Sequence, residues 1–110
     1  MNQDAKTLLW LAIEDYSGLW EAVWELRSLH PRADSDELIA TSKEVLAGFL
    51  RDGLIELYRC VEPYGDMTRV DDGDAPRLLE VAEGWDAPED GALSVRFSAT
   101  SAGEALTISR

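Results

Sequence analysis

The spacing of hydrophobic residues predicts two consecutive amphipathic helices at the N-terminal end of the chain. They cover residues 4–15 and 18–29, with Ser17 expected as the N-cap of the second and His30-Pro31 as its end, because a residue before proline leaves the helical region. The apolar stripes consist of Leu8, Leu11, Ala12 and Tyr16 in the first helix, and of Leu19, Val23 and Leu26 in the second.

A third amphipathic helix is predicted from Asp34 to Asp52, and a strand follows it directly. Asp34 with Glu37 three residues later is a capping-box arrangement, and Gly53 can adopt the left-handed conformation that ends a helix. Residues 54–61 are then expected to be extended. The buried face of the helix is formed by Leu38, Ile39, Val45, Leu46, Phe49 and Leu50.

The C-terminal half is irregular before it becomes regular again. Residues 62–92 are interrupted by glycine and proline, and Pro76 at a first helical position predicts a short helix over 76–83. Residues 93–99 alternate, with Leu93, Val95, Phe97 and Ala99 on one face and Ser94, Arg96 and Ser98 on the other. This pattern predicts a half-buried strand that pairs with 54–61. Ser101 with Glu104 predicts a final short helix.

The length and charge of the chain restrict its class. A length of 110 residues predicts a single domain over 1–110, and the predicted elements make it α+β and mainly helical. Ten basic residues stand against 22 acidic ones, a formal net charge of −12. Such a field repels phosphate backbones and anionic lipids and favours basic partners.

Candidate catalytic and metal-binding residues are few. One cysteine, Cys60, and one histidine, His30, exclude an intramolecular disulfide and a Cys/His zinc site. Asp71-Asp72-Gly73-Asp74 lacks the spacing of a calcium-binding loop and is expected to be an exposed acidic tip. No nucleophile, phosphate-loop or dinucleotide motif is present, so we expect a non-catalytic protein without cofactor or metal. Without a signal peptide or membrane-spanning run, a cytoplasmic protein is expected.

Two short motifs resemble those of a winged helix-turn-helix domain. Residues 45–56, VLAGFLRDGLIE, look like the exit of a recognition helix into a wing in bacterial regulators, and residues 97–104, FSATSAGE, look like the segment that closes such a wing. The resemblance implies three N-terminal helices and a two-stranded antiparallel wing with short extra helices, in which 62–92 is an enlarged wing connection. It also implies a DNA-binding transcriptional regulator, with Arg32, Lys43 and Arg51 nearest the groove.

The charge of the expected recognition helix favours a different function. Residues 35–52 carry four acidic residues and only two basic ones, Lys43 and Arg51, and no three basic residues cluster anywhere in the chain. Affinity for DNA comes mainly from Lys and Arg that neutralise phosphates. We therefore expect a protein–protein interaction domain, and keep DNA binding as the alternative.

The tryptophans are the candidate interface residues. Trp20 and Trp24 lie one turn apart on the second helix, and Trp10 lies on the first. Large aromatic side chains fill helical cores, but tryptophan is also enriched at binding hot spots. We expect Trp10, Trp20 and Trp24 to contribute to a partner or dimer interface. Residues 1–17 would then be a dimerisation element of a homodimer, and the unknown protein partner would be basic.

Overall fold

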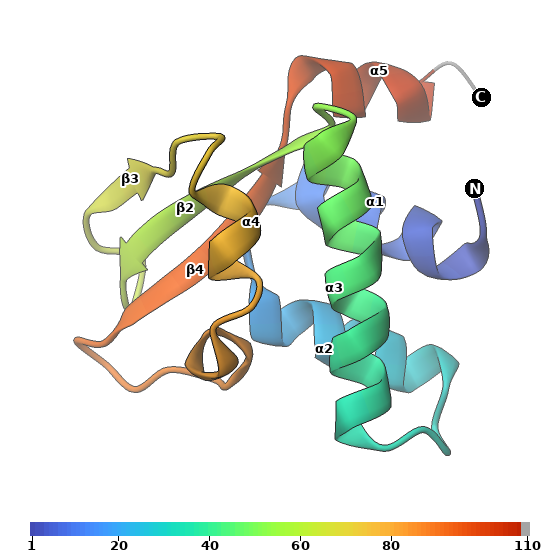
Figure 1. Cartoon of the computed structure of the whole chain (residues 1–110), viewed down its shortest axis with the longest axis horizontal. Coiled ribbons are helices and arrows are strands. Elements are labelled where there is room, and N and C mark those ends of the chain that lie inside the picture. The colour runs from blue at the N-terminus through green and yellow to red at the C-terminus, as the bar shows by residue number, and fades with distance from the viewer. Residues whose placement is uncertain (109–110) are drawn as a thin grey trace.

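The chain folds into an α+β structure in which a helical half packs against a small antiparallel sheet (Figure 1). The structure, a computed structural model, describes the backbone of residues 1–108 and the side chains of residues 1–106. In chain order the elements are α1 (Gln3–Glu14), β1 (Ser17–Gly18), α2 (Leu19–Leu29), α3 (Ser35–Arg51), β2 (Ile55–Val61), β3 (Met67–Arg69), α4 (Ala75–Leu78), the 3-10 helix η1 (Ala82–Trp85), β4 (Leu93–Ala99) and α5 (Ser101–Ile108).

The three N-terminal helices lie where the hydrophobic spacing predicts them. Of the two N-caps predicted for these helices, one is confirmed and one is wrong. The predicted cap of α3 is confirmed, because Asp34 accepts a hydrogen bond from the Glu37 backbone N–H at 2.8 Å. The predicted cap of α2 is wrong. Gly18 occupies that position, and Ser17 instead donates its hydroxyl to the Leu11 carbonyl at 3.1 Å, which ties β1 to the end of α1.

The predicted pairing of the two long strands is confirmed, but the sheet has four strands rather than two. β2 pairs antiparallel with β4 over their full length, with Leu57 opposite Phe97. β1 adds to the outer edge of β4 and β3 to the outer edge of β2, giving the order β1-β4-β2-β3. The two added strands have two and three residues, too short to show an alternating pattern in the sequence.

The helix predicted over residues 76–83 is divided into two shorter pieces. α4 ends at Leu78, and η1 begins at Ala82. Between them the Leu79 carbonyl accepts the indole N–H of Trp85 at 2.8 Å, and Trp85 is buried. The backbone is extended at Val81, so the helix is not continuous there. The buried Trp85 anchors the 62–92 segment in the hydrophobic core.

A single hydrophobic core lies between the sheet and the helices. The sheet supplies Ile55, Leu57, Val95 and Phe97 from one face. The helices and the 62–92 connection supply Leu8, Leu9, Ala12, Leu19, Ala22, Val23, Leu26, Leu38, Leu46, Phe49, Val70, Ala75, Leu79 and Trp85. In Figure 1 α4 and η1 stand between the sheet and α3, so the connection closes one side of this core.

The strand 93–99 departs from its predicted burial at two places. Leu93, expected inside, is 72 % exposed because it extends beyond the helices. Ser94 and Arg96, expected on the polar face, are buried. The sheet is therefore covered on both faces near the middle of β4, by hydrophobic side chains on one and by a polar network on the other.

No helix within residues 1–108 is both long and apolar enough to cross a membrane.

Two glycines provide a matched test of this packing. Gly103, at the start of α5, lies so close to β2 that an added Cβ would stand 2.2 Å from the Leu54 carbonyl oxygen. Gly103→Ala should lower the free energy of unfolding by about 1–3 kcal/mol. At Gly48, inside α3, the nearest atom to an added Cβ is the flexible Arg51 guanidinium at 3.4 Å. Gly48→Ala should raise the free energy of unfolding by about 0.5–1 kcal/mol, since alanine has a higher helix propensity than glycine. Urea denaturation measures both, and equal effects would contradict the packing described.

Candidate functional site

Trp10 lies on the outer face of α1, beside a shallow groove between α1 and α2. Its side chain is 54 % exposed. The groove has a volume of about 280 Å³ and is lined by Gln3, Lys6, Thr7, Trp10, Leu11 and Glu14 from α1 and by Glu25 from α2. α1 and α2 run in opposite directions here, since Asp4 at the start of α1 contacts His30 at the end of α2 at 2.7 Å. Trp10 is thus an exposed aromatic ring beside two carboxylates.

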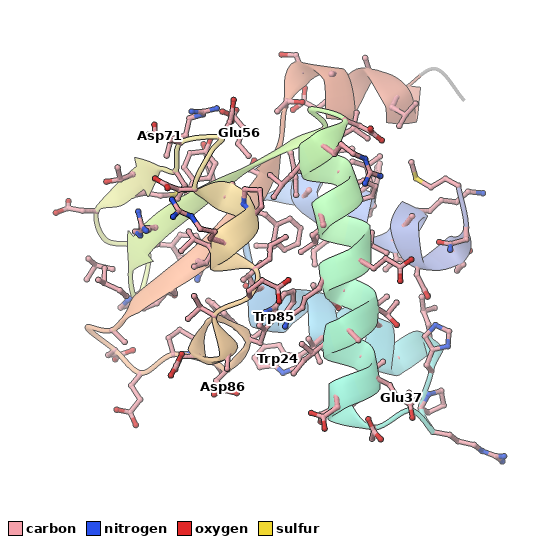
Figure 2. The ribbon with its side chains drawn as sticks, in the orientation of Figure 1. Trp24, Glu37, Glu56, Asp71, Trp85 and Asp86 are labelled. Carbon is pink, nitrogen blue, oxygen red and sulfur yellow. The ribbon has the colours of Figure 1, made fainter. Side chains whose placement is uncertain are left out.

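Trp24 is equally exposed but belongs to another flank of α2. Its side chain is 57 % exposed. Successive residues of an α-helix point about 100° apart, so Trp24 points away from the groove that its neighbour Glu25 lines. Figure 2 places Trp24 on the side of α2 that faces η1, below the buried Trp85. The structure therefore does not join Trp10 and Trp24 into one continuous aromatic patch.

Trp20 does not share this exposure. It is 6 % exposed, and its indole ring packs on the Arg96 guanidinium with 5.1 Å between the guanidinium carbon and the ring centroid. The backbone of Gly18 lies against the same ring, since an added Cβ there would stand 2.3 Å from it. The prediction of Trp20 as an interface residue is therefore corrected. The Trp20 side chain is buried because its ring packs against Arg96, on the face of the sheet opposite the main core.

The predicted DNA contacts do not form a basic surface. Lys43 lies 3.6 Å from the Glu80 carboxylate, and Arg51 lies 3.9 Å from that of Asp52. Arg32 is exposed in the turn between α2 and α3 and makes no ion pair with the described residues. The fully exposed residues of α3 are Ser35, Asp36, Glu37, Ala40, Glu44, Ala47 and Arg51. Three carboxylates thus face solvent along this helix against one guanidinium.

Carboxylates are also spread over the other faces of the molecule. In Figure 2 Glu56 and Asp71 lie together at the β2–β3 side, Asp86 lies beside η1, and Glu37 lies at the beginning of α3. Some are neutralised locally: Arg69 pairs with Glu56 and with Asp72, and Arg77 pairs with Asp74. Within the described residues no group of three or more His, Cys, Asp and Glu side chains is arranged to hold a metal ion.

A buried ion pair between Arg96 and Glu62 occupies the face of the sheet opposite the main core. The guanidinium donates to both carboxylate oxygens, from Nη2 to Oε1 at 2.5 Å and from Nε to Oε2 at 2.9 Å. Ser94 donates to the same carboxylate at 2.7 Å, and Arg96 Nη1 donates to the Tyr16 carbonyl at 2.7 Å. The guanidinium contacts two aromatic rings, Trp20 and Tyr64, the second with its centroid 4.2 Å away.

The electrostatics of this network follow from its geometry. The hydrogen bonds from Arg96 hold the pKa of Glu62 at about 2, well below its usual 4.5, although burial of the carboxylate acts in the opposite direction. Burial raises the pKa of the neighbouring Cys60 thiol, and the hydrogen bond with Glu62 adds to this effect. A buried thiol of raised pKa is a poor nucleophile. Each buried side-chain nitrogen or oxygen of the described residues has a hydrogen-bond partner, so the polar groups of this network stabilise one another within the fold.

Sequence reasoning missed this network because its members are distant in the chain. Arg96 and Glu62 are 34 residues apart, and Tyr16 is 80 residues from Arg96. The available signal was an arginine in the middle of a strand expected to be half-buried, where a buried charge without a partner is costly. The carboxylate that pairs with Arg96 lies just after the facing strand, because Glu62 directly follows β2.

Comparison with known proteins finds no relative of this chain. No described protein family, no curated protein and no solved structure matches it. The function must therefore be inferred from the groove beside Trp10, the exposed Trp24 and the distribution of charge.

The buried ion pair predicts a defined pH dependence of stability. Because the pKa of Glu62 is lowered on folding, its contribution is complete above the ordinary value of 4.5 and is lost as the pH falls from there toward 2. Glu62→Gln should cost about 3 kcal/mol of unfolding free energy at pH 7, since it removes the carboxylate that accepts two hydrogen bonds from the buried Arg96 and leaves only the more exposed Glu21 as a counter-charge. The difference from the natural protein should shrink between pH 4.5 and 2.

Denaturant unfolding across this pH range measures the effect. Glu89→Gln removes an exposed carboxylate whose side chain has no partner among the described residues, and it should leave stability unchanged within about 0.5 kcal/mol. A constant difference between the natural protein and Glu62→Gln at all pH values would contradict the ionised pair.

Proposed function

We propose that this chain is a non-catalytic protein–protein interaction domain that binds protein through the two exposed tryptophans of α1 and α2. The observation that carries the proposal is the contrast among its four tryptophans. Trp20 and Trp85 are buried with defined polar or cationic neighbours, whereas Trp10 and Trp24 expose more than half of their side chains. An exposed indole buries a large apolar area when a partner covers it, and this is why tryptophan is enriched at hot spots.

We further propose a winged-helix-like architecture and a homodimeric, cytoplasmic protein. Support for the architecture comes from the passage between α3 and β2. Gly53 has φ +72° at the end of α3, the chain enters β2 within two residues, and β2 pairs with β4 across the long connection. After β4, Thr100 closes the segment by donating its hydroxyl to the Gly53 carbonyl at 2.6 Å. Support for a dimer comes from the exposed rings, which a second copy would cover.

The alternative function, DNA reading, has less support. In a winged-helix protein α3 would enter the groove, but its exposed side chains are mostly acidic and two of the three candidate contacts, Lys43 and Arg51, already lie beside carboxylates. Binding to DNA requires a basic stripe along the element that enters the groove. The charge of −12 therefore favours a polypeptide over a nucleic acid as the partner.

Removal of the exposed rings should weaken association without loss of stability. The natural protein is expected to elute as a dimer, and the double variant Trp10→Ala/Trp24→Ala as a monomer, because a partner surface loses its two largest apolar anchors. Size-exclusion chromatography with light scattering over a dilution series measures this. The two single variants show which ring carries the contact.

Trp20→Ala provides the matched comparison for that experiment. It should cost about 3–5 kcal/mol of unfolding free energy, because its ring is buried, whereas the double variant should unfold near the natural midpoint. A natural protein that stays monomeric over the series, or a double variant that stays dimeric, would contradict the proposed dimer surface.

A DNA-binding assay tests the alternative. Electrophoretic shift of a random duplex at low salt should show no complex with the natural protein, because α3 presents three exposed carboxylates and no cluster of free cations. Salt-sensitive binding that is lost in Lys43→Ala/Arg51→Ala would establish the DNA-binding function in place of the one proposed. Glu44→Lys/Glu37→Lys, which makes the same face basic, is the positive comparison.

A further inference from the structure

The groove beside Trp10 has the components of a site for one cationic side chain. Trp10 provides an accessible aromatic face, Glu14 lies one helical turn further along α1, and Glu25 approaches from α2. At about 280 Å³ the groove is just below the range of about 300–1,000 Å³ that small-molecule ligands and cofactors occupy. The groove is open to solvent and large enough to take one long side chain of a partner.

The two carboxylates of the groove are not neutralised by the protein itself. Neither Glu14 nor Glu25 makes an ion pair with any described residue. Elsewhere, Glu56, Asp72, Asp74 and Glu80 each have an arginine or lysine within 4 Å. The groove is therefore a place where aromatic surface and unpaired negative charge lie side by side.

Lys6 also lines the groove, but on the opposite side of Trp10 from Glu14 along α1. It precedes Trp10 by four residues, whereas Glu14 follows Trp10 by four, so the rise between Lys6 and Glu14 along α1 is about 12 Å. Lys6 forms no ion pair with Glu14 or Glu25. Glu14 and Glu25 thus remain available to a cation from outside.

We propose that this groove binds an arginine side chain of a basic partner protein, with the guanidinium over the Trp10 ring and paired with Glu14 and Glu25. The inference rests on the proposed function, and it names the chemistry of the partner. Arginine is preferred over lysine because its planar guanidinium stacks on tryptophan and offers several donors to carboxylates at the same time.

The interior of the same protein uses an equivalent arrangement. Arg96 lies over Trp20 while donating to Glu62. The difference is that both the cation and the acid are supplied there by the chain, whereas at Trp10 only the ring and the acids are present. A second copy of this chain would cover the Trp10 ring in a dimer but, at a charge of −12, would not neutralise Glu14 and Glu25, so the cation is assigned to a basic partner.

The experiment measures the affinity of the full chain for capped hexa-arginine, hexa-lysine and hexa-glutamate peptides. Two-dimensional NMR follows the Trp10 indole N–H, and calorimetry gives the dissociation constant. Hexa-arginine should shift the Trp10 signal saturably and bind more tightly than hexa-lysine, and hexa-glutamate should not bind. Trp10→Ala and Glu14→Gln/Glu25→Gln should each raise the dissociation constant for hexa-arginine by about fivefold to tenfold.

Matched variants separate a defined site from general attraction between charges. Trp24→Ala removes an equally exposed ring outside the groove, and Glu89→Gln/Asp90→Gln removes the same number of exposed carboxylates elsewhere. Both should leave the dissociation constant unchanged within about twofold. Equal weakening by these controls, or no saturable shift of the Trp10 signal, overturns the proposal.

The outcomes also distinguish this inference from the proposed function. If dimerisation requires Trp24 and the peptides do not bind at Trp10, the interaction domain stands and the arginine site fails. If hexa-arginine binds at Trp10 but the natural protein is monomeric, the arginine site stands and the homodimer fails. If Glu14→Gln/Glu25→Gln binds the peptide as well as the natural protein does, while Trp10→Ala does not, the guest is held by apolar contact and the cationic site is overturned.

Discussion

The ion pair between Arg96 and Glu62 is the interaction on which the outer side of this fold depends. It joins β4, the end of β2 and, through the Tyr16 carbonyl, the segment that leads from α1 into β1. A buried charge is tolerated only when it is paired and hydrogen-bonded. Trp20 and Tyr64 pack against the Arg96 guanidinium. These side chains cover that face of the sheet in place of a second layer of helices. The cation thus organises a small second core.

This arrangement frees the first two helices to present their outer sides to solvent. Trp20 turns inward to cover the guanidinium, while Trp24, one turn later, and Trp10 on α1 remain exposed. The distribution of charge then separates two kinds of surface. One is acidic and spread over several faces, including the exposed side of α3 (Figure 2). The other, at Trp10, is aromatic and bordered by the unpaired carboxylates Glu14 and Glu25.

The local elements could be predicted from the sequence because their signals are local. The three helices, the Asp34 cap, the left-handed Gly53 and the pairing of 54–61 with 93–99 are confirmed. The two short edge strands, the division of the helix at 76–83 and the burial of Ser94 and Arg96 were not predicted. β1 and the burial of Ser94 and Arg96 depend on contacts between residues distant in the chain. The division at 76–83 accompanies a bond between the Trp85 indole and the Leu79 carbonyl, which hydrophobic spacing does not record. At the candidate site the sequence indicated the three tryptophans but could not separate the buried one from the exposed ones.

The sequence by itself determined the α+β class, the strongly acidic surface and the supply of large aromatic residues on the first two helices, because composition and hydrophobic period are properties of neighbouring residues. Only the tertiary structure decided which ring is exposed to solvent. Trp20 and Trp24 stand one turn apart on the same helix, and what distinguishes them is the Arg96 guanidinium, 76 residues beyond Trp20, which contacts Trp20 and not Trp24. Which of the two rings is buried depends on tertiary packing, and the hydrophobic period of the helix does not predict it.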